Sequence, residues 1–191
     1  MAVLPELVEL TTRLVGFNPV SVAGRSGPAK TQPTRAIGDF ISGWLERAGF
    51  RVQQYPYTTD GVDKMNLVAT KGGDEPFLAL SGHMDVVPVG KWKDGFEPFI
   101  LKAGYYEDKK ANTRYDCLYG RGSADMKLFL ALAMLAGGRI SAAVLKRPLG
   151  IYLTSDEEVG CLGVKLLFQE QARGLKAHTE FKVKTQEHPQ V

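Results

Sequence analysis

The chain has 191 residues, 44% hydrophobic and 24% charged, a composition that suits one globular domain with a real core. The net charge of +3 is small and the basic residues are scattered, so nucleic acid is not an expected partner. A signal peptide is not evident and no apolar run is long enough to span a bilayer, so we expect a cytoplasmic protein without a membrane partner. Cys117 and Cys161 lie far apart and are expected to be free thiols.

The first half of the chain predicts helices and a pair of strands. An amphipathic pattern at i, i+3, i+4, i+7 and i+8 is followed by Gly49, a residue typical of helix C-termini. A turn signal, Thr59-Asp60-Gly61, separates two strand-like runs. In chain order the predicted elements are a helix over 4–15, a loop over 16–33, a helix over 37–48, and strands over 51–57 and 66–70.

The second half predicts alternating buried strands and helices. Apolar runs of five or six residues favour buried strands, and longer runs rich in Ala and Leu favour helices. A polar, charged stretch is expected to be a solvated excursion. The predicted elements are a strand over 76–80, an aromatic-containing loop over 88–98, the excursion over 103–116, a helix over 125–136, a strand over 149–154 and a helix over 160–173.

His83 and Asp85 follow directly after the strand predicted over 76–80. Side chains two apart on an extended segment point to the same side, so both can face one cleft. A metal-binding histidine usually has its second ring nitrogen held by a carboxylate or carbonyl, and Asp85 could supply that group. A histidine and an aspartate in an ordinary polar loop fit the same residues.

Two further acidic clusters follow at comparable positions. Asp125 comes after a Gly-Arg-Gly turn and opens a predicted helix, where it could also be a plain N-terminal cap. Glu157 and Glu158 come after the strand predicted over 149–154, where a solvated acidic pair is the simpler alternative. Strand ends that present such side chains are where an α/β sheet builds its site.

These side chains together suit a metal centre. One imidazole with several carboxylates favours zinc, cobalt or manganese over a structural zinc site made of thiolates. A carboxylate such as Asp125 can bridge two metals. Glu157 and Glu158 are adjacent, so one can bind metal while the other takes a proton from water as the general base.

Three motifs resemble one family of enzymes. They are Ser-Gly-His-Met-Asp-Val-Val-Pro at 81–88, Leu-Tyr-Gly-Arg-Gly-Ser-Ala-Asp-Met-Lys at 118–127 and Thr-Ser-Asp-Glu-Glu at 154–158. In order and spacing they resemble the co-catalytic zinc hydrolases: aminoacylase, acetylornithine deacetylase, succinyl-diaminopimelate desuccinylase and glutamate carboxypeptidase. The resemblance covers about residues 4–175 and is nearest to acetylornithine deacetylase, with the desuccinylase second.

The resemblance implies an α/β fold of the zinc-exopeptidase kind, with a mostly parallel sheet and helices on both faces. It implies two zinc ions, for which cobalt may substitute, as cofactors. His83 resembles a ligand of one metal, Asp125 the bridging carboxylate and Glu158 a ligand of the other metal. Glu157 resembles the general base, and Asp85 the residue that orients His83.

The implied reaction is hydrolysis of an N-acyl amino acid, most nearly N-acetylornithine to ornithine and acetate in arginine biosynthesis. The implied partner is this small-molecule substrate, and full-length family members are commonly homodimers. A desuccinylase or another aminoacylase or carboxypeptidase of the family is the first alternative. An inactive remnant that binds only metal or a partner is the second.

The sequence departs from the family pattern at two places. Leu128 stands where the family usually has glycine after Asp-Met-Lys. The stretch 174–183 omits the Gly-Glu-Pro-Thr motif that supplies a further ligand, and neither His178 nor Glu180 is assigned to metal. We therefore expect residues 1–191 to be the N-terminal part of the catalytic domain, without the dimerisation domain and C-terminal half, and inactive alone.

Overall fold

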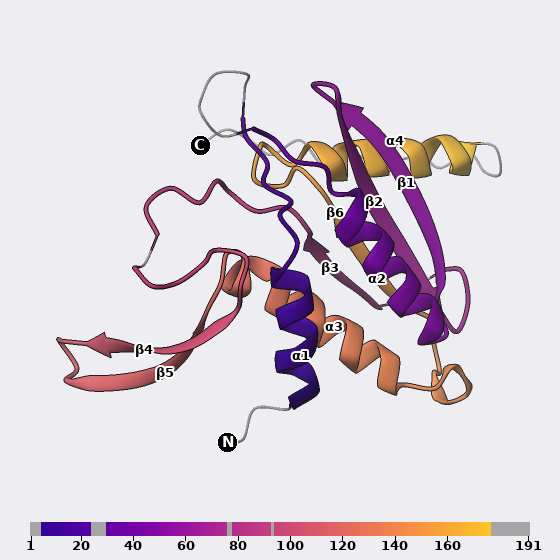
Figure 1. Ribbon diagram of the computed structural model, residues 1–191. Helices are drawn as coiled ribbons and strands as arrows, with labels where there is room; N and C mark the ends of the chain where they lie inside the picture. Colours follow the sequence, from indigo (N-terminus) through magenta and orange to yellow (C-terminus); the bar gives the residue numbers. More distant parts are fainter. Residues whose placement is uncertain (1–4, 24–29, 76–77, 93, 177–191) are drawn as a thin grey trace, which may run out of the picture.

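A four-stranded sheet with helices on both faces forms the body of the molecule, and a separate two-stranded hairpin projects from it (Figure 1). The computed structural model describes residues 5–23, 30–75, 78–92 and 94–176. The elements are α1 (Pro5–Val15), α2 (Arg35–Arg47), β1 (Arg51–Thr59), β2 (Val62–Lys71), β3 (Leu78–His83), β4 (Lys102–Asp108), β5 (Thr113–Tyr119), a π-helical turn (Ser123–Lys127), α3 (Leu128–Arg139), a 3-10 turn (Ala142–Val144), β6 (Leu149–Thr154) and α4 (Leu162–Lys176).

The strands of the main sheet lie in the order β1-β2-β6-β3. The expected α/β class is confirmed, but the strand directions differ from a mostly parallel sheet. β1 pairs antiparallel with β2, and β2 antiparallel with β6, whereas β3 and β6 are parallel. The first antiparallel pair follows from a tight turn, because Asp60 and Gly61 both adopt positive φ angles, 50° and 77°, as hairpin turns of this type require.

The helices cover the two faces of this sheet, as expected. On one face, α1, α2 and α3 pack on the alternate apolar residues of β2 and β6; on the other, α4 lies against the remaining residues, and the Asn66 amide donates to the Gly163 carbonyl at 2.8 Å. Strand residues alternate between faces, and nearly all residues of both strands are buried, so both strands are covered on both sides. The core on the first face includes Leu14, Ile41, Leu45, Met65, Leu67, Leu130, Met134, Ile151 and Leu153.

Residues 103–116, expected to be a solvated excursion, are largely exposed, and they form most of the hairpin of β4 and β5, which was not predicted. The two strands pair in continuous antiparallel register from Lys102 opposite Tyr119 to Asp108 opposite Thr113. The two strands were missed because the hairpin is exposed on both sides, so its sequence has no apolar alternation to reveal them. Its aromatic residues are held locally instead, as where the Arg114 guanidinium lies 3.9 Å from the ring centroid of Tyr105.

The helix expected from residue 125 begins at Leu128. A single π-helical turn precedes it, closed by a hydrogen bond from the Lys127 amide to the Gly122 carbonyl at 2.8 Å. Gly122 has a positive φ of 74°, and a Cβ at this position would lie 2.5 Å from the Val86 side chain, so only glycine fits. Asp125 has non-helical backbone angles and does not cap α3, which corrects the helix-cap alternative.

The ends of the chain are described only in part. The predicted helix over 160–173 corresponds to α4, which runs to Lys176. His178 and Glu180, the residues left without a metal assignment, lie outside the described residues. Among the helices that are described, none has both the length and the apolar character needed to cross a membrane.

Candidate metal centre

The parallel pairing of β3 with β6 brings two of the three predicted clusters together. His83 pairs with Thr154 at the C-terminal ends of the two strands, and the Met84 amide donates to the Thr154 carbonyl at 2.8 Å. The segments that follow, one through Asp85 and the other through Glu158, therefore leave the sheet side by side. This is the edge at which α/β sheets place their ligands.

His83 is nearly buried, and both of its ring nitrogens have partners. Nδ1 lies 3.0 Å from the backbone carbonyl of Asp85, which can only accept, so Nδ1 carries the proton. Nε2 faces two carboxylates, at 3.1 Å from Oδ1 of Asp125 and 3.9 Å from Oε2 of Glu157. In the neutral ring Nε2 therefore carries no proton, and its lone pair is available to a metal ion. It points toward the carboxylates of Asp125 and Glu157.

Asp85 is fully buried and has more partners than the sequence indicated. Its carboxylate lies 3.6 Å from Nδ1 of His83, beyond the closer contact that its own backbone carbonyl makes. The two carboxylate oxygens accept hydrogen bonds from the backbone N–H groups of Glu157 and Glu158, each at 3.2 Å. Asp85 therefore connects the histidine to the glutamate pair.

Glu157 and Glu158 lie on the turn between β6 and α4 and reach toward His83. One donor atom from each of these three residues lies within 4.8 Å of the other two, a spacing that a single metal ion could bridge. The Glu157 side chain is 44% exposed, and its other oxygen, Oε1, lies 3.8 Å from the Cys161 thiol. Asp125 is 77% exposed and adjoins this group through Nε2 of His83.

The charges at this site shift the pKa values of its members in a consistent way. Burial alone would lower the pKa of His83, but hydrogen bonds and charge from Asp85 and Asp125 outweigh it and raise the pKa to about 9. Burial would raise the pKa of Asp85, yet His83 and the two backbone N–H groups hold it below its usual range. For Glu158, burial and neighbouring carboxylates raise the pKa despite the attraction of His83. The acidic cluster thus favours a cation at its centre.

A cavity of about 240 Å³ opens beside these residues. Asp125 and Glu158 both line it, together with the glycine-rich turn of 120–122 and Val86. Arg121 also lines the cavity, and its guanidinium donates to the Pro88 and Val89 carbonyls at 3.2 and 2.9 Å. The cavity gives a small ligand access to the carboxylates.

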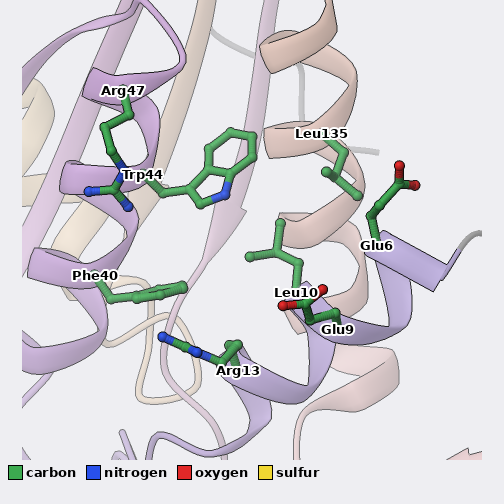
Figure 2. A pocket seen from close by; sticks show the side chains of 8 residues that line it. All are labelled: Glu6, Glu9, Leu10, Arg13, Phe40, Trp44, Arg47 and Leu135. Atoms are coloured by element: carbon green, nitrogen blue, oxygen red, sulfur yellow. The ribbon is translucent and has the colours of Figure 1, made fainter.

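A second hollow, of about 280 Å³, lies between α1, α2 and α3 (Figure 2). Its charged side chains are on the surface, and Glu6 is paired with Arg139 at 3.0 Å. Arg13 stacks 5.6 Å from the Phe40 ring centroid. This hollow holds no histidine and no converging group of carboxylates, so it offers none of the chemistry found at the strand ends.

Sequence reasoning missed a group of buried polar residues directly behind the glutamate pair. Asp156, quoted within the Thr-Ser-Asp-Glu-Glu motif but given no role, forms an ion pair with Lys64 at 2.9 Å, with both side chains buried. A signal existed, because Lys64 and Asn66 alternate with the apolar residues Met65 and Leu67. Buried polar residues in such a strand must have specific partners.

The donor set fits zinc. Nδ1 of His83 is held by a carbonyl, the arrangement by which proteins fix the tautomer of a metal-binding imidazole. The remaining donors are carboxylate oxygens, which zinc accepts alongside nitrogen. A single ion could contact His83, Glu157 and Glu158, and Asp125 adjoins them through Nε2 of His83.

Comparison with known proteins identifies what the chain resembles. The sequence model of Peptidase family M20/M25/M40 matches residues 79–189. Acetylornithine deacetylase of Pasteurella multocida (strain Pm70) is 33% identical over 171 residues, which is 88% of this chain and 41% of that protein. Acetylornithine deacetylase of Vibrio vulnificus (strain CMCP6) is 33% identical over 179 residues, 94% of this chain and 41% of that protein. The chain spans about two fifths of the length of the curated relatives it matches.

Solved structures show the same fold. Human carnosine dipeptidase 1 superimposes with a TM-score of 0.63 at 21% identity, covering 92% of this chain and 37% of that one. Porphyromonas gingivalis glutaminyl cyclase superimposes with a TM-score of 0.53 at 18% identity, covering 84% and 51%. At these identities the likeness establishes the fold alone.

Proposed function

Since the chain belongs to Peptidase family M20/M25/M40, we propose that it carries the metal centre of a zinc-dependent amidohydrolase that releases an amino acid from its N-acyl form. N-acetylornithine is the proposed substrate, with ornithine and acetate as products, in cytoplasmic arginine biosynthesis. The observation that supports this best is the convergence of His83, Glu157 and Glu158 at the adjacent ends of β3 and β6. The similarity to acetylornithine deacetylases over most of the chain supports the choice of acyl group.

In this proposal each residue has a separate task. His83 and Glu158 would each hold a metal ion, Asp125 would be the ligand shared between the two, and Asp85 fixes the His83 ring and the backbone of the glutamate pair. When bound, zinc polarises a carbonyl and makes water more acidic. Glu157, partly exposed at the edge of the site, accepts the proton of the attacking water and returns it to the nitrogen of the leaving amino acid.

The three-donor spacing also favours a competing assignment for Glu157. In that assignment Glu157 is a third ligand of one ion with His83 and Glu158, and the chain binds metal without catalysing hydrolysis. This assignment is compatible with the inactive remnant considered from the sequence, which binds only metal or a partner. The desuccinylase alternative differs from the deacetylase in the acyl group that is released.

We extend the proposal to domain organisation: residues 1–191 correspond to the N-terminal part of the catalytic domain, and the whole protein is a homodimer that adds a dimerisation domain. The relatives' greater length supports the additional domain, and the homodimer is carried over from the resemblance to full-length family members.

The decisive first experiment is a calorimetric titration of the chelator-treated chain with Zn²⁺ and with Co²⁺. Binding is expected in the wild type and is expected to be abolished in His83→Ala, while Cys117→Ala, on the remote hairpin, serves as the matched control. Wild-type protein that is folded and binds neither ion would contradict the proposal. Parallel assays with N-acetylornithine and N-succinyl-diaminopimelate, run on a preparation that contains the whole protein, distinguish the two acyl groups.

A further inference from the structure

A buried ion pair lies directly behind the proposed metal centre, and no role assigned so far uses it. Asp156 immediately precedes Glu157, and its Oδ1 lies 2.9 Å from Nζ of Lys64 on β2. The two side chains are 1% and 0% exposed. A fully buried ion pair contributes little net stability, because desolvation of the two charges offsets their attraction. Stability alone therefore does not explain why Asp156 and Lys64 are paired at this place.

The carboxylate of Asp156 is also hydrogen-bonded from two further segments. The Ser21 hydroxyl donates to Oδ1 at 2.7 Å, and the Tyr57 hydroxyl on β1 donates to Oδ2 at 3.1 Å. Burial, together with the charge of Asp156, raises the pKa of Tyr57 above its usual range, so the phenol keeps its proton and remains a donor. Lys64 in turn donates to Ser21 at 3.0 Å. Both carboxylate oxygens are thus anchored to the body of the domain.

The backbone at Asp156 is held in an unusual conformation. Its φ is 58°, in the left-handed region that non-glycine residues seldom occupy. Its carbonyl accepts the Leu162 amide at 3.1 Å, which ties the turn to the start of α4. Such conformations persist where the surroundings impose them, and they cluster at functional sites.

The turn is therefore held from two sides. In front, the Asp85 carboxylate accepts the N–H groups of Glu157 and Glu158. Behind, the Asp156 carboxylate is fixed by Lys64 and its hydroxyl partners. Because Asp156 and Glu157 are consecutive, anchoring the first and bending its backbone determines where the second leaves the turn.

We propose that Asp156, paired with Lys64, is a positioning residue that directs Glu157 and Glu158 toward His83. The inference rests on the proposed function where it concerns metal, but it also makes a statement about the metal-free chain. Loss of the pair should free the backbone of the glutamate turn while the strands beside it stay intact.

The test compares Asp156→Asn with Leu45→Ala, a core substitution on α2 on the opposite face of the sheet, which is expected to be destabilising without touching the turn. Amide hydrogen exchange is measured by NMR on the metal-free chain, under conditions where circular dichroism shows each variant to be folded. In Asp156→Asn we expect the Glu157 and Glu158 amides to exchange at least about tenfold faster, while those of β6 stay within about twofold of wild type. In Leu45→Ala the exchange rates of the two glutamate amides should change by the same factor as those of the β6 amides.

Cobalt binding provides the second readout. In Asp156→Asn the Co²⁺ affinity is expected to fall about 10- to 100-fold, as for other residues that orient metal ligands, and the visible absorption bands of bound Co²⁺ should change. Leu45→Ala should leave both unchanged. If Asp156→Asn does not fold because Lys64 is left unpaired, the double variant Lys64→Met with Asp156→Asn removes both charges and is read in the same way.

The outcomes separate the two proposals. Folded Asp156→Asn, or the folded double variant, with wild-type protection at Glu157 and Glu158 would overturn the positioning role, whatever the metal result. Wild-type chain that does not bind Co²⁺ would instead overturn the proposed metal centre, and amide exchange would still decide the role of Asp156.

Discussion

At the scale of single residues, the site depends on backbone groups as much as on side chains. The imidazole of His83 is held by the carbonyl of Asp85, and the Asp85 carboxylate holds the N–H groups of Glu157 and Glu158. Asp85 therefore orients the His83 ring and also fixes the backbone of the glutamate pair. The sequence suggested only the first, because backbone hydrogen bonds across two strand ends leave no pattern in residue type.

The role of Glu157 is tested by Glu157→Gln at the aligned position of a complete homologous enzyme. An amide cannot accept the proton of water, so turnover should fall about 10²–10⁴-fold, the usual contribution of a general base. The metal content, measured by atomic absorption, should stay at the wild-type value. Loss of bound zinc in this variant would show that Glu157 is a ligand, and the competing assignment would be correct.

At the scale of elements, long polar side chains connect the sheet to the ends of the helices. Lys71, at the end of β2, donates to the Gly137 and Ile140 carbonyls at the C-terminus of α3, at 2.8 and 3.1 Å. Its ammonium also lies 4.3 Å from the centroid of the Phe50 ring. A cation at this end of a helix is favoured by the helix dipole. Lys127 is similarly buried and donates to the Phe17 carbonyl just beyond α1 at 2.8 Å.

Lys71→Met should destabilise the chain by about 1–3 kcal/mol, because two buried carbonyls lose their donor. Chemical denaturation monitored by circular dichroism measures this, and Lys102→Met on the exposed hairpin is the control. An unchanged free energy of unfolding would mean that water replaces the lysine without cost.

The same substitution should alter the pH dependence of stability. Burial lowers the pKa of Lys71 from its ordinary value of 10.5, so above the folded-state pKa the unfolded chain binds this proton more readily than the folded chain does. Stability contributed by this residue therefore rises as pH increases toward 10.5. The difference in unfolding free energy between wild type and Lys71→Met should widen over that range, and a difference independent of pH would contradict the assignment.

At the scale of the whole molecule, β3 is an edge strand of the sheet, and the described residues offer few metal ligands. β3 pairs only with β6 among the described residues, so its other side presents unpaired backbone groups. An apolar hollow of about 310 Å³ between this edge and α4 lies nearby, and Leu78 and Phe168 are 57% and 65% exposed. Exposed apolar edges of this kind favour association.

We expect the 191-residue chain to self-associate with increasing concentration. Leu78→Lys combined with Phe168→Lys should shift it toward monomer in analytical ultracentrifugation, because charge at an edge opposes pairing. Tyr106→Lys, at an exposed tyrosine of the β4–β5 hairpin, is the control and should have no effect. If the double variant and the control variant self-associate to the same extent, the association does not use the β3 edge.

The chain alone should not hydrolyse N-acetylornithine at a useful rate. With Glu157 reserved as base, one metal would have His83 and Asp125 and the other Glu158 and Asp125, whereas a catalytic zinc usually has three protein ligands. Acetate release in excess Zn²⁺ or Co²⁺ is the measurement. Turnover of roughly 1–10³ per second, the common range for enzymes, would show that the chain completes its site in another way.

The local pattern of the sequence was enough to predict most elements. The structure brings His83, Glu157 and Glu158 close together, and their assignment as site residues stays a prediction. The helix predicted over 37–48 and the strand predicted over 149–154 are both present in the structure. Their prediction succeeded because apolar periodicity shows which face is buried, and that information is local. The placement of His83 and the glutamate pair at strand ends followed from where the apolar runs stop. Their individual roles stay predictions.

Only the tertiary structure decided what depends on pairing between distant segments. The antiparallel pairing of β2 with β6, the exposed hairpin of β4 and β5, and the shift of Asp125 out of the helix all arise from such contacts. So does the pairing of Lys64 with Asp156, which are 92 positions apart in the sequence numbering. Residue type shows that a buried charge needs a partner, but the register of the sheet determines which one it meets.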